Sequence, residues 1–187
     1  MWATERRRAL AGFMAFGLFW GAWGAVLPAV QVSSGSTDGE LGTALLMIGL
    51  GALVSMRLTG HLVDRFGAGV LPVMMVGFAA AGVLPAFAGS PVALGAALLL
   101  LGALSGATDV AINAAGVHAE IRSQRALMNL AHAWFSVGVV VASLNTAALR
   151  AAGAGPRLVL GAVFSLRPLR PDASPAMPWC AASSRFG

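Results

Sequence analysis

Residues 59–69 read TGHLVDRFGAG and place a histidine, an aspartate and an arginine in one short polar stretch. The chain around this stretch is mostly apolar: 58% of its residues are hydrophobic, 10% are charged, and the mean hydropathy is +0.80. A soluble domain of 187 residues needs a charged surface, which seven acidic residues and twelve arginines cannot supply. The composition therefore indicates a protein whose surface is solvated by lipid.

Five apolar blocks flank the short polar connectors of the chain. Each is close to the length of about 20 residues that a helix needs to cross the hydrocarbon core. We predict membrane spans at residues 9–30, 41–59, 70–88, 92–117 and 126–149, and a partial sixth at 156–164. Short connectors favour antiparallel neighbours. The sequence thus predicts an all-α membrane bundle over residues 1–164.

The arginines are distributed unevenly between the two sides of this predicted bundle. With a cytoplasmic N-terminus, seven face the cytoplasm and two the outside; the inner ones are Arg6, Arg7, Arg8, Arg57, Arg65, Arg122 and Arg125, and the outer ones Arg150 and Arg157. This bias follows the positive-inside rule and predicts a multi-pass protein of the inner (plasma) membrane with its N-terminus inside. The first apolar block exceeds the 7–15 residues of a cleaved signal, which favours a span.

The helical pattern stops inside the sixth block. Residues 165–187 contain four prolines, Pro168, Pro171, Pro175 and Pro178, together with three arginines and the single Cys180. A proline in a helix interior costs ~3 kcal/mol, so this segment cannot be one continuous span. Our hypothesis is an irregular tail derived from a displaced reading frame or a truncated gene; the alternative is a natural disordered tail.

The polar stretch lies between the second and third predicted spans, on the predicted cytoplasmic side. Its pattern of Gly60, Leu62, Asp64, Arg65 and Gly67 resembles the loop signature of the major facilitator superfamily (MFS), which lies between the same two helices. The resemblance implies a transporter fold of which this chain is the N-terminal half. It also implies that the aspartate and the base act as a conformational latch between two halves. The usual bases after the last glycine are replaced here by Ala68 and Gly69.

Three further stretches resemble the fucose-permease-like and sugar-permease-related branch of that superfamily. They are FWGAWGAVLPAVQ (19–31), GATDVAINAAGVHAE (106–120) and LMNLAHAWFSVG (127–138). The branch implies symport of a small solute such as a sugar with protons. Its sugar-proton carriers also have an acid in helix one, and no acid lies between residues 9 and 30 here.

Polar residues recur at helical spacing in the fourth and fifth blocks. Ser105, Asp109, Asn113, Gly116 and Glu120 share one face of the fourth, and Asn129, His132, Ser136 and Ser143 one face of the fifth. An aspartate at mid-membrane costs ~2.5–3.5 kcal/mol on insertion scales, so Asp109 should face water or a partner. We predict a cavity in which Asp109, Asn113 and His132 serve proton coupling.

Each of these candidates has a structural alternative. Asp109 can form a static tie to another helix, the asparagines can join helices by hydrogen bonds, and His132 can be an ordinary interior histidine. Glu120 lies near enough to the cytoplasmic end to be simply solvated. Trp20, Trp23 and Trp134 can stack on a solute, but tryptophan also belongs at membrane interfaces.

Several classes of function are disfavoured by the sequence. The arginines form no stripe typical of nucleic-acid binding. His61, His118 and His132 are scattered, and no phosphate loop, nucleophile–base pair or metal cluster occurs, so we expect no enzyme, cofactor or metal site. The expected partners are the lipid bilayer, a small solute, protons, and a second half or a second copy of the chain. The competing hypothesis is a non-transporting membrane fragment or an interaction subunit.

Overall fold

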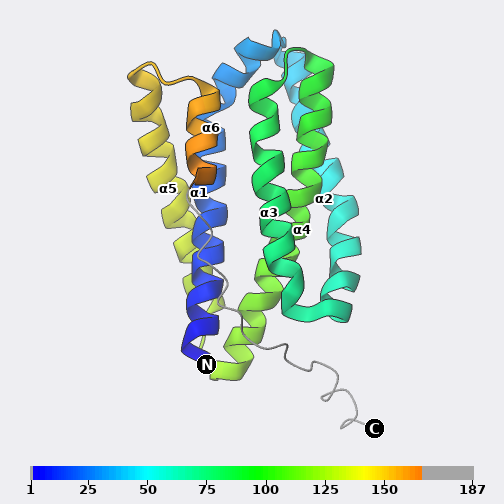
Figure 1. The fold of residues 1–187 in the computed structure, drawn as a ribbon, viewed down its shortest axis with the longest axis vertical. Helices are drawn as coiled ribbons and strands as arrows, with labels where there is room; N and C mark the ends of the chain where they lie inside the picture. Colours follow the sequence, from blue (N-terminus) through cyan, green and yellow to red (C-terminus); the bar gives the residue numbers. More distant parts are fainter. Residues whose placement is uncertain (1, 166–187) are drawn as a thin grey trace.

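A computed structural model describes residues 2–165 of the protein, with side chains placed for residues 4–67 and 69–162. This part of the chain folds into six α-helices and two short 3₁₀ helices and contains no strand (Figure 1). The elements are α1 (Trp2–Ser34), α2 (Asp38–Phe66), η1 (Gly67–Gly69), α3 (Val70–Val83), η2 (Leu84–Phe87), α4 (Pro91–Ser123), α5 (Met128–Ala151) and α6 (Pro156–Ser165). The predicted all-α class is confirmed. The predicted tail, apart from Ser165, lies outside the described residues.

Two of the helix starts are fixed by side chains that the sequence supplies locally. At the start of α2, the backbone N–H of Thr37 donates to Glu40 Oε2 at 2.8 Å, and Thr37 Oγ1 accepts from the N–H of Glu40 at 3.3 Å. At the start of α4, Ser90 Oγ accepts from the N–H of Ala93 at 3.2 Å, and Pro91 takes the first helical position. Such caps satisfy orphan N–H groups and define where each hairpin turns.

Helix α2 continues beyond the predicted span 41–59 and through most of the polar stretch. Gly60 is helical, and α2 ends only at Phe66. The turn is therefore confined to η1. Gly67 adopts φ 59°, a left-handed value that glycine reaches without a Cβ clash, and its N–H donates to the carbonyl of Val63. Asp64 and Arg65 consequently lie on the last helical turn of α2 and not in a loop.

Five helices are long and apolar enough to cross a membrane: α1, α2, α3 together with η2, α4 and α5. Helices α1, α2 and α4 extend beyond the predicted spans at both ends, because their caps and charged residues continue the helix past the apolar block. The most apolar 18-residue stretch of α2 is 11% buried, against 44% in α1 and in α4. The fold is thus a multi-pass membrane bundle with α2 at its perimeter and α1 and α4 inside.

The bundle consists of two three-helix units, α1–α3 and α4–α6, that pack on one another in a reciprocal way (Figure 1). Helix α1 packs chiefly on α5, and α2 chiefly on α4. Helix α3 packs on α4, and α6 on α1. If α1–α3 and α4–α6 are exchanged in order, the α1–α5 pair becomes the α4–α2 pair, and the α3–α4 pair becomes the α6–α1 pair. Because successive helices alternate in direction, the two units run in opposite senses, as in an inverted repeat.

Glycine pairs make both of the principal contacts close. A Cβ at Gly17 or Gly21 in α1 would overlap the backbone carbonyls of Phe135 or Val139 in α5. In α4, a Cβ at Gly102 would overlap the backbone of Ile48, and one at Gly106 would lie 2.7 Å from Ala52 Cα. Small residues allow helix backbones to approach in lipid, where apolar burial does not drive association. The sequence therefore determines both contacts by the same spacing of four residues.

The interior between the two units is filled mainly by aromatic and leucine side chains. Phe19 and Phe78 contact edge to face with ring centroids 4.5 Å apart, and Phe16 lies 5.2 Å from Phe78. Leu94, Leu98 and Leu101 of α4 are fully buried. The short α6 is packed into the same core through Val159 and Leu160. This apolar core holds α1 and α4 in fixed positions relative to each other.

Candidate functional site

The polar residues predicted for a cavity occupy adjacent parts of α4 and α5. Asn113 lies one turn after Asp109, and its Nδ2 donates to the Asp109 carboxylate at 3.1 Å and to the Asp109 carbonyl at 2.9 Å. The Asp109 side chain is half-buried. Asn113 therefore orients the Asp109 carboxylate from within the same helix. This arrangement leaves the other carboxylate oxygen available to a group outside α4.

His132 is the candidate proton-coupling residue that α5 contributes. No hydrogen bond or ion pair joins its ring to the Asp109 carboxylate among the described residues. The centroid of the His132 ring lies 5.1 Å from that of Phe13 in α1. Its Nδ1 lies 2.9 Å from the Met128 carbonyl oxygen. With Nδ1 donating to that carbonyl, Nε2 remains available to exchange a proton. His132 is exposed on the described bundle.

Some of the remaining residues of the two polar faces are exposed, and others are buried or bond to another helix. Asn129 and Ser136 are exposed on α5, and Ser136 Oγ donates to its own helix, to the His132 carbonyl. Ser143 Oγ instead donates across the helices to the Gly21 carbonyl at 3.1 Å. Ser105 is 6% exposed. The polar faces therefore combine hydrogen bonds between helices with three residues that keep part of their surface exposed, Asp109, Asn113 and His132.

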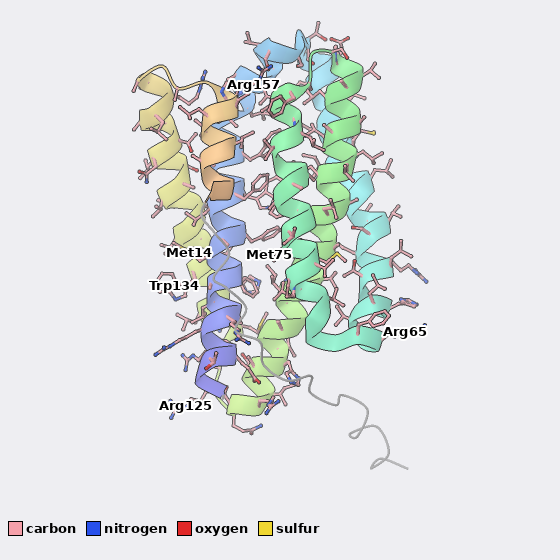
Figure 2. The ribbon with its side chains drawn as sticks, in the orientation of Figure 1. Met14, Arg65, Met75, Arg125, Trp134 and Arg157 are labelled. Atoms are coloured by element: carbon pink, nitrogen blue, oxygen red, sulfur yellow. The ribbon has the colours of Figure 1, made fainter. Side chains whose placement is uncertain are left out.

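The three tryptophans proposed to stack on a solute have different environments. Trp23 is 3% exposed and belongs to the apolar core, so its ring offers no free face in this bundle. Trp20 is half-buried and contacts Phe16 and Phe19 edge to face. Trp134 is 42% exposed on α5 (Figure 2). Of the three, Trp134 is the one with an accessible ring on the helix that carries His132.

The motif of Gly60, Leu62, Asp64, Arg65 and Gly67 is named the latch motif here, after the role that the resemblance implies. It lies at the same end of the bundle as the N-terminus, where Figure 2 also places Arg65 and Arg125. Leu62, Asp64 and Arg65 are exposed, and the Arg65 guanidinium lies over the Phe66 ring at 5.5 Å from its centroid. Asp64 and Arg65 form no ion pair with each other, because the arginine lies over the aromatic ring. Asp64 has no hydrogen-bond or ion-pair partner among residues 2–165.

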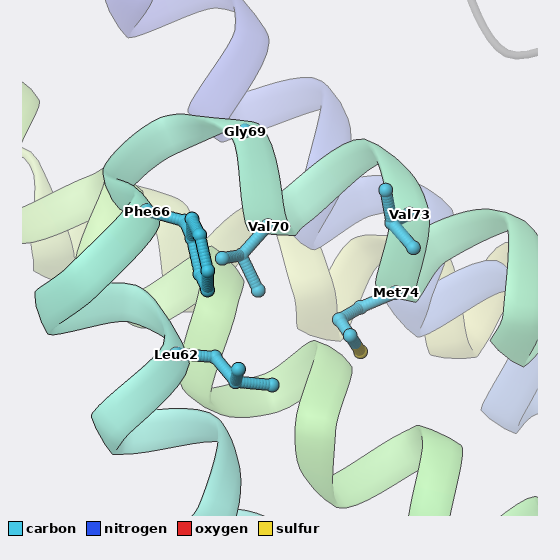
Figure 3. Close-up of a pocket in the computed structure, with 6 residues that line it drawn as sticks. All are labelled: Leu62, Phe66, Gly69, Val70, Val73 and Met74. Carbon is cyan, nitrogen blue, oxygen red and sulfur yellow. The ribbon is translucent and has the colours of Figure 1, made fainter.

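An apolar depression of about 450 Å³ adjoins the latch motif (Figure 3). It is lined by Leu62, Phe66, Gly69, Val70, Val73 and Met74 from the end of α2, η1 and the start of α3. It contains no residue of the Asp109 site. The latch motif and the polar site are therefore separate places on the bundle, joined through α2 and its packing on α4.

Three polar residues that stabilise the bundle were missed or misread in the sequence. For Glu120 the sequence left simple solvation open, and the structure adds a role: its Oε2 accepts from the backbone N–H groups of Leu127 at 2.6 Å and Met128 at 2.8 Å, which caps α5. Arg122 forms an ion pair with Glu5 at 3.6 Å, joining α4 to α1. Thr108 is fully buried and its Oγ1 lies 3.1 Å from the Met74 carbonyl of α3. The signal for Thr108 was its place among small residues of α4.

The described part of the chain contains no group of three or more histidine, cysteine, aspartate or glutamate side chains that could hold a metal ion. The site is instead an isolated carboxylate, an amide and an imidazole in an apolar bundle. Such a set can bind and release protons and donate or accept hydrogen bonds.

The chain is similar to membrane transporters. It is 35% identical over 159 residues to an uncharacterized MFS-type transporter of Yersinia pestis, and 36% identical over 143 residues to an uncharacterized transporter of Sinorhizobium fredii. It is also 30% identical over 129 residues to the membrane protein MosC of Rhizobium meliloti. These matches cover 84%, 74% and 68% of this chain. No family model matches the chain, and no solved structure matches it significantly.

The fold and these similarities together support a membrane transporter, and the first relative supports membership of the major facilitator superfamily. The matches span 41%, 37% and 32% of the relatives' own lengths. The chain thus spans about two fifths or less of the relatives that it matches. The activity, substrate and partners of the whole protein are therefore matters for proposal.

Proposed function

We propose that this chain is part of a secondary active transporter of the major facilitator type that carries a small polar solute, such as a sugar, together with protons. The observation that carries the proposal is the half-buried Asp109 carboxylate, which Asn113 orients from the same helix. An acid in the middle of a bilayer-spanning helix is expensive and typically functional. The identity of the relatives as transporters supports the same conclusion.

The proton step that we propose uses the two titratable groups of this site. The Asp109 carboxylate accepts a proton, and the neighbouring His132 imidazole exchanges it with water or solute at its free nitrogen. Asn113 holds one carboxylate oxygen from α4, so that protonation of the other changes the charge of the site without moving α4. Binding a proton and a solute in the same region links their transport. Trp134 is the proposed stacking surface for the solute.

Transport by alternating access requires two halves that move against each other around such a site. We infer that a second half, or a second copy of the chain, covers the exposed faces of α2 and α5. The latch motif supports this, because Asp64 has no partner among residues 2–165 and is free to meet the positive end of a partner helix. The five motif residues would then stabilise one of the two transport states.

We also propose an inner-membrane location with the N-terminus in the cytoplasm. The arginine bias supports this orientation, since Arg65 and Arg125 lie at the N-terminal end of the bundle and Arg157 at the opposite end (Figure 2). The latch motif then faces the cytoplasm.

The test is uptake of labelled small solutes into proteoliposomes under an imposed proton gradient, with the complete chain, Asp109→Asn and a control. Asp38→Asn is the matched control, because Asp38 undergoes the same chemical change at the exposed start of α2, far along the bundle from Asp109. We expect gradient-driven uptake by the unmodified chain and by Asp38→Asn. Uptake by Asp109→Asn should fall to the level of empty liposomes.

The other outcomes discriminate between the hypotheses. Equal uptake by Asp109→Asn and the unmodified chain would remove Asp109 from proton coupling. No uptake by a correctly inserted chain, alone or with a co-reconstituted partner half, would favour a membrane fragment or an interaction subunit that does not transport.

A further inference from the structure

A second depression lies where α1 ends, α5 ends and α6 begins. These three helix ends lie at the end of the bundle opposite the N-terminus (Figure 1). Its volume is about 410 Å³, and it is lined by Pro28, Ala29, Val32, Ser33, Arg150 and Pro156. It contains no residue of the Asp109 site or the latch motif. It therefore belongs to neither of the sites that the proposed function uses.

Arg150 is the single charged side chain that lines this depression. One of its terminal nitrogens donates to the Ala154 carbonyl at 2.7 Å, and no other partner occurs within residues 2–165. A guanidinium has five N–H donors in a rigid fork that matches phosphate geometry. The half-buried Arg150 thus presents its unused donors at the rim of a depression.

The electrostatic surroundings of Arg150 favour an anion. The depression adjoins the start of α6 at Pro156, and a helix start carries partial positive charge. The two acids near this end are engaged elsewhere: Asp38 accepts from Gln31 Nε2 at 2.7 Å, and Glu40 accepts from Thr37. Neither of them therefore neutralises Arg150 through an ion pair.

The other walls of the depression are apolar and open. Val32 is 82% exposed, and Pro28 lies one helical turn before it on α1, also exposed. Because α1 ends at Ser34 and α5 at Ala151, this place corresponds to the boundary between hydrocarbon and headgroups. An exposed apolar wall in the same depression as a guanidinium matches one class of molecule in that layer, a phospholipid.

We propose that this depression binds a phospholipid with a net negative headgroup. The phosphate accepts hydrogen bonds from the Arg150 guanidinium, and the first part of an acyl chain lies on Pro28, Ala29 and Val32. Bound there, the lipid joins the end of α1 to the loop that leads from α5 into α6. The proposal does not depend on transport, and it holds for either orientation of the chain in the membrane.

Native mass spectrometry of the complete chain tests this proposal. The protein is released from nanodiscs that contain equal amounts of phosphatidylglycerol and phosphatidylcholine with identical acyl chains. We expect preferential retention of one phosphatidylglycerol. Arg150→Gln, which keeps an N–H donor for the Ala154 carbonyl, should lower this retention about fivefold, the effect of removing one basic charge near a lipid surface.

Two further variants keep the result interpretable. Val32→Glu adds an acid on the exposed wall and should also lower the retention, without removing a buried contact. Arg57→Gln is the matched control, since Arg57 is an exposed arginine of the spanning helix α2 outside the depression. This variant should retain phosphatidylglycerol as the unmodified chain does. Equal retention of the two lipids, or no effect of Arg150→Gln and Val32→Glu, would overturn the proposal.

The source of the phosphate is tested separately in neutral detergent. Glycerol 3-phosphate or inorganic phosphate alone should leave the thermal midpoint unchanged, whereas short-chain phosphatidylglycerol should raise it. A rise with free phosphate that Arg150→Gln abolishes would identify a site for a soluble anion instead of a lipid site.

Discussion

Helices α2 and α5 hold equivalent places in the two units of the bundle, yet they present different surfaces. Each packs through a glycine contact on the first helix of the other unit: Gly51 of α2 on Leu99 and Ala103 of α4, and Gly138 of α5 on Met14 and Leu18 of α1. Each leaves most of its length exposed. Along the middle of α2 the exposed side chains are mostly large and apolar, including Leu46, Leu50, Leu53 and Leu58. On α5 they include Asn129, His132, Ser136 and Asn145.

This difference shows that the two units share their helix packing but not their exposed polar side chains. Helix packing depends on backbone approach, which glycines at equivalent places provide in both units. Proton exchange depends on titratable side chains, and the exposed face of α5 carries one, His132, among its polar residues. The repeat therefore accounts for stability, while the departure from the repeat accounts for the candidate site.

The largest effect is expected from filling a glycine contact. Gly17→Val and Gly102→Val place side-chain atoms into the backbones of Phe135 and Ile48. Overpacking of this kind costs ~1–3 kcal/mol, and more where backbone must move. If close glycine contacts stabilise both units equally, both variants should lower the free energy of unfolding by similar amounts. The measurement is denaturation with dodecyl sulfate in mixed micelles.

Matched controls for this experiment exist in the same two helices. No atom of a neighbour lies within 4 Å of a Cβ built at Gly24 in α1 or at Gly95 in α4. Gly24→Val and Gly95→Val should therefore leave the unfolding free energy nearly unchanged. A penalty as large as that of the contact variants would show that valine harms these helices irrespective of packing.

A smaller effect is expected at the cap that distinguishes the start of α5. Glu120→Ala removes the acceptor for the backbone N–H groups of Leu127 and Met128, whereas Glu120→Gln retains an oxygen. Loss of a helix cap typically costs ~0.5–2 kcal/mol. The same micelle denaturation should give a clear loss for the alanine variant and a smaller one for the glutamine variant. Equal stability of all three proteins would mean that solvent replaces this cap.

The smallest effect concerns a serine of α5 that donates to another helix, whereas a serine of α2 donates within its own helix. Ser143 Oγ donates to the Gly21 carbonyl of α1, while Ser55 Oγ of α2 donates to Ala52 in its own helix. Hydrogen bonds between membrane helices contribute about 0.6 kcal/mol on average. Ser143→Ala should therefore destabilise the bundle by about that amount and by more than Ser55→Ala. The reverse order would assign the difference to packing alone.

Much of the fold could be predicted because it depends on local patterns. Apolar blocks of the right length predict helices, and the structure contains an all-α bundle with five helices able to span a membrane. The stretch 59–69 shows the limit of this reasoning. Its polar residues and glycines suggested a loop, but α2 continues to Phe66, because an exposed helical turn accommodates Asp64 and Arg65 as well as a loop does.

The candidate site could be predicted only in part. Spacing placed Asp109 and Asn113 on one helix face, since residues four apart are neighbours on a helix. Trp23 and Trp20 lie close together in sequence, but one is buried in the core and the other is half-exposed, which depends on how α1 meets the other helices. Glu120 could be seen as an acid near a helix end, but its role follows from where α5 begins.

The sequence by itself determined that this protein is a membrane bundle, where its helices lie and which residues are expensive to place in lipid. These properties follow from hydropathy and helical periodicity, which are local. Only the tertiary structure decided that α1 packs on α5 and α2 on α4, that Trp23 is buried while Trp134 is exposed, and that Arg150 lines a depression shared by three helix ends. These properties depend on contacts between residues distant in the chain, and such contacts are set by backbone approach and side-chain packing over the whole bundle.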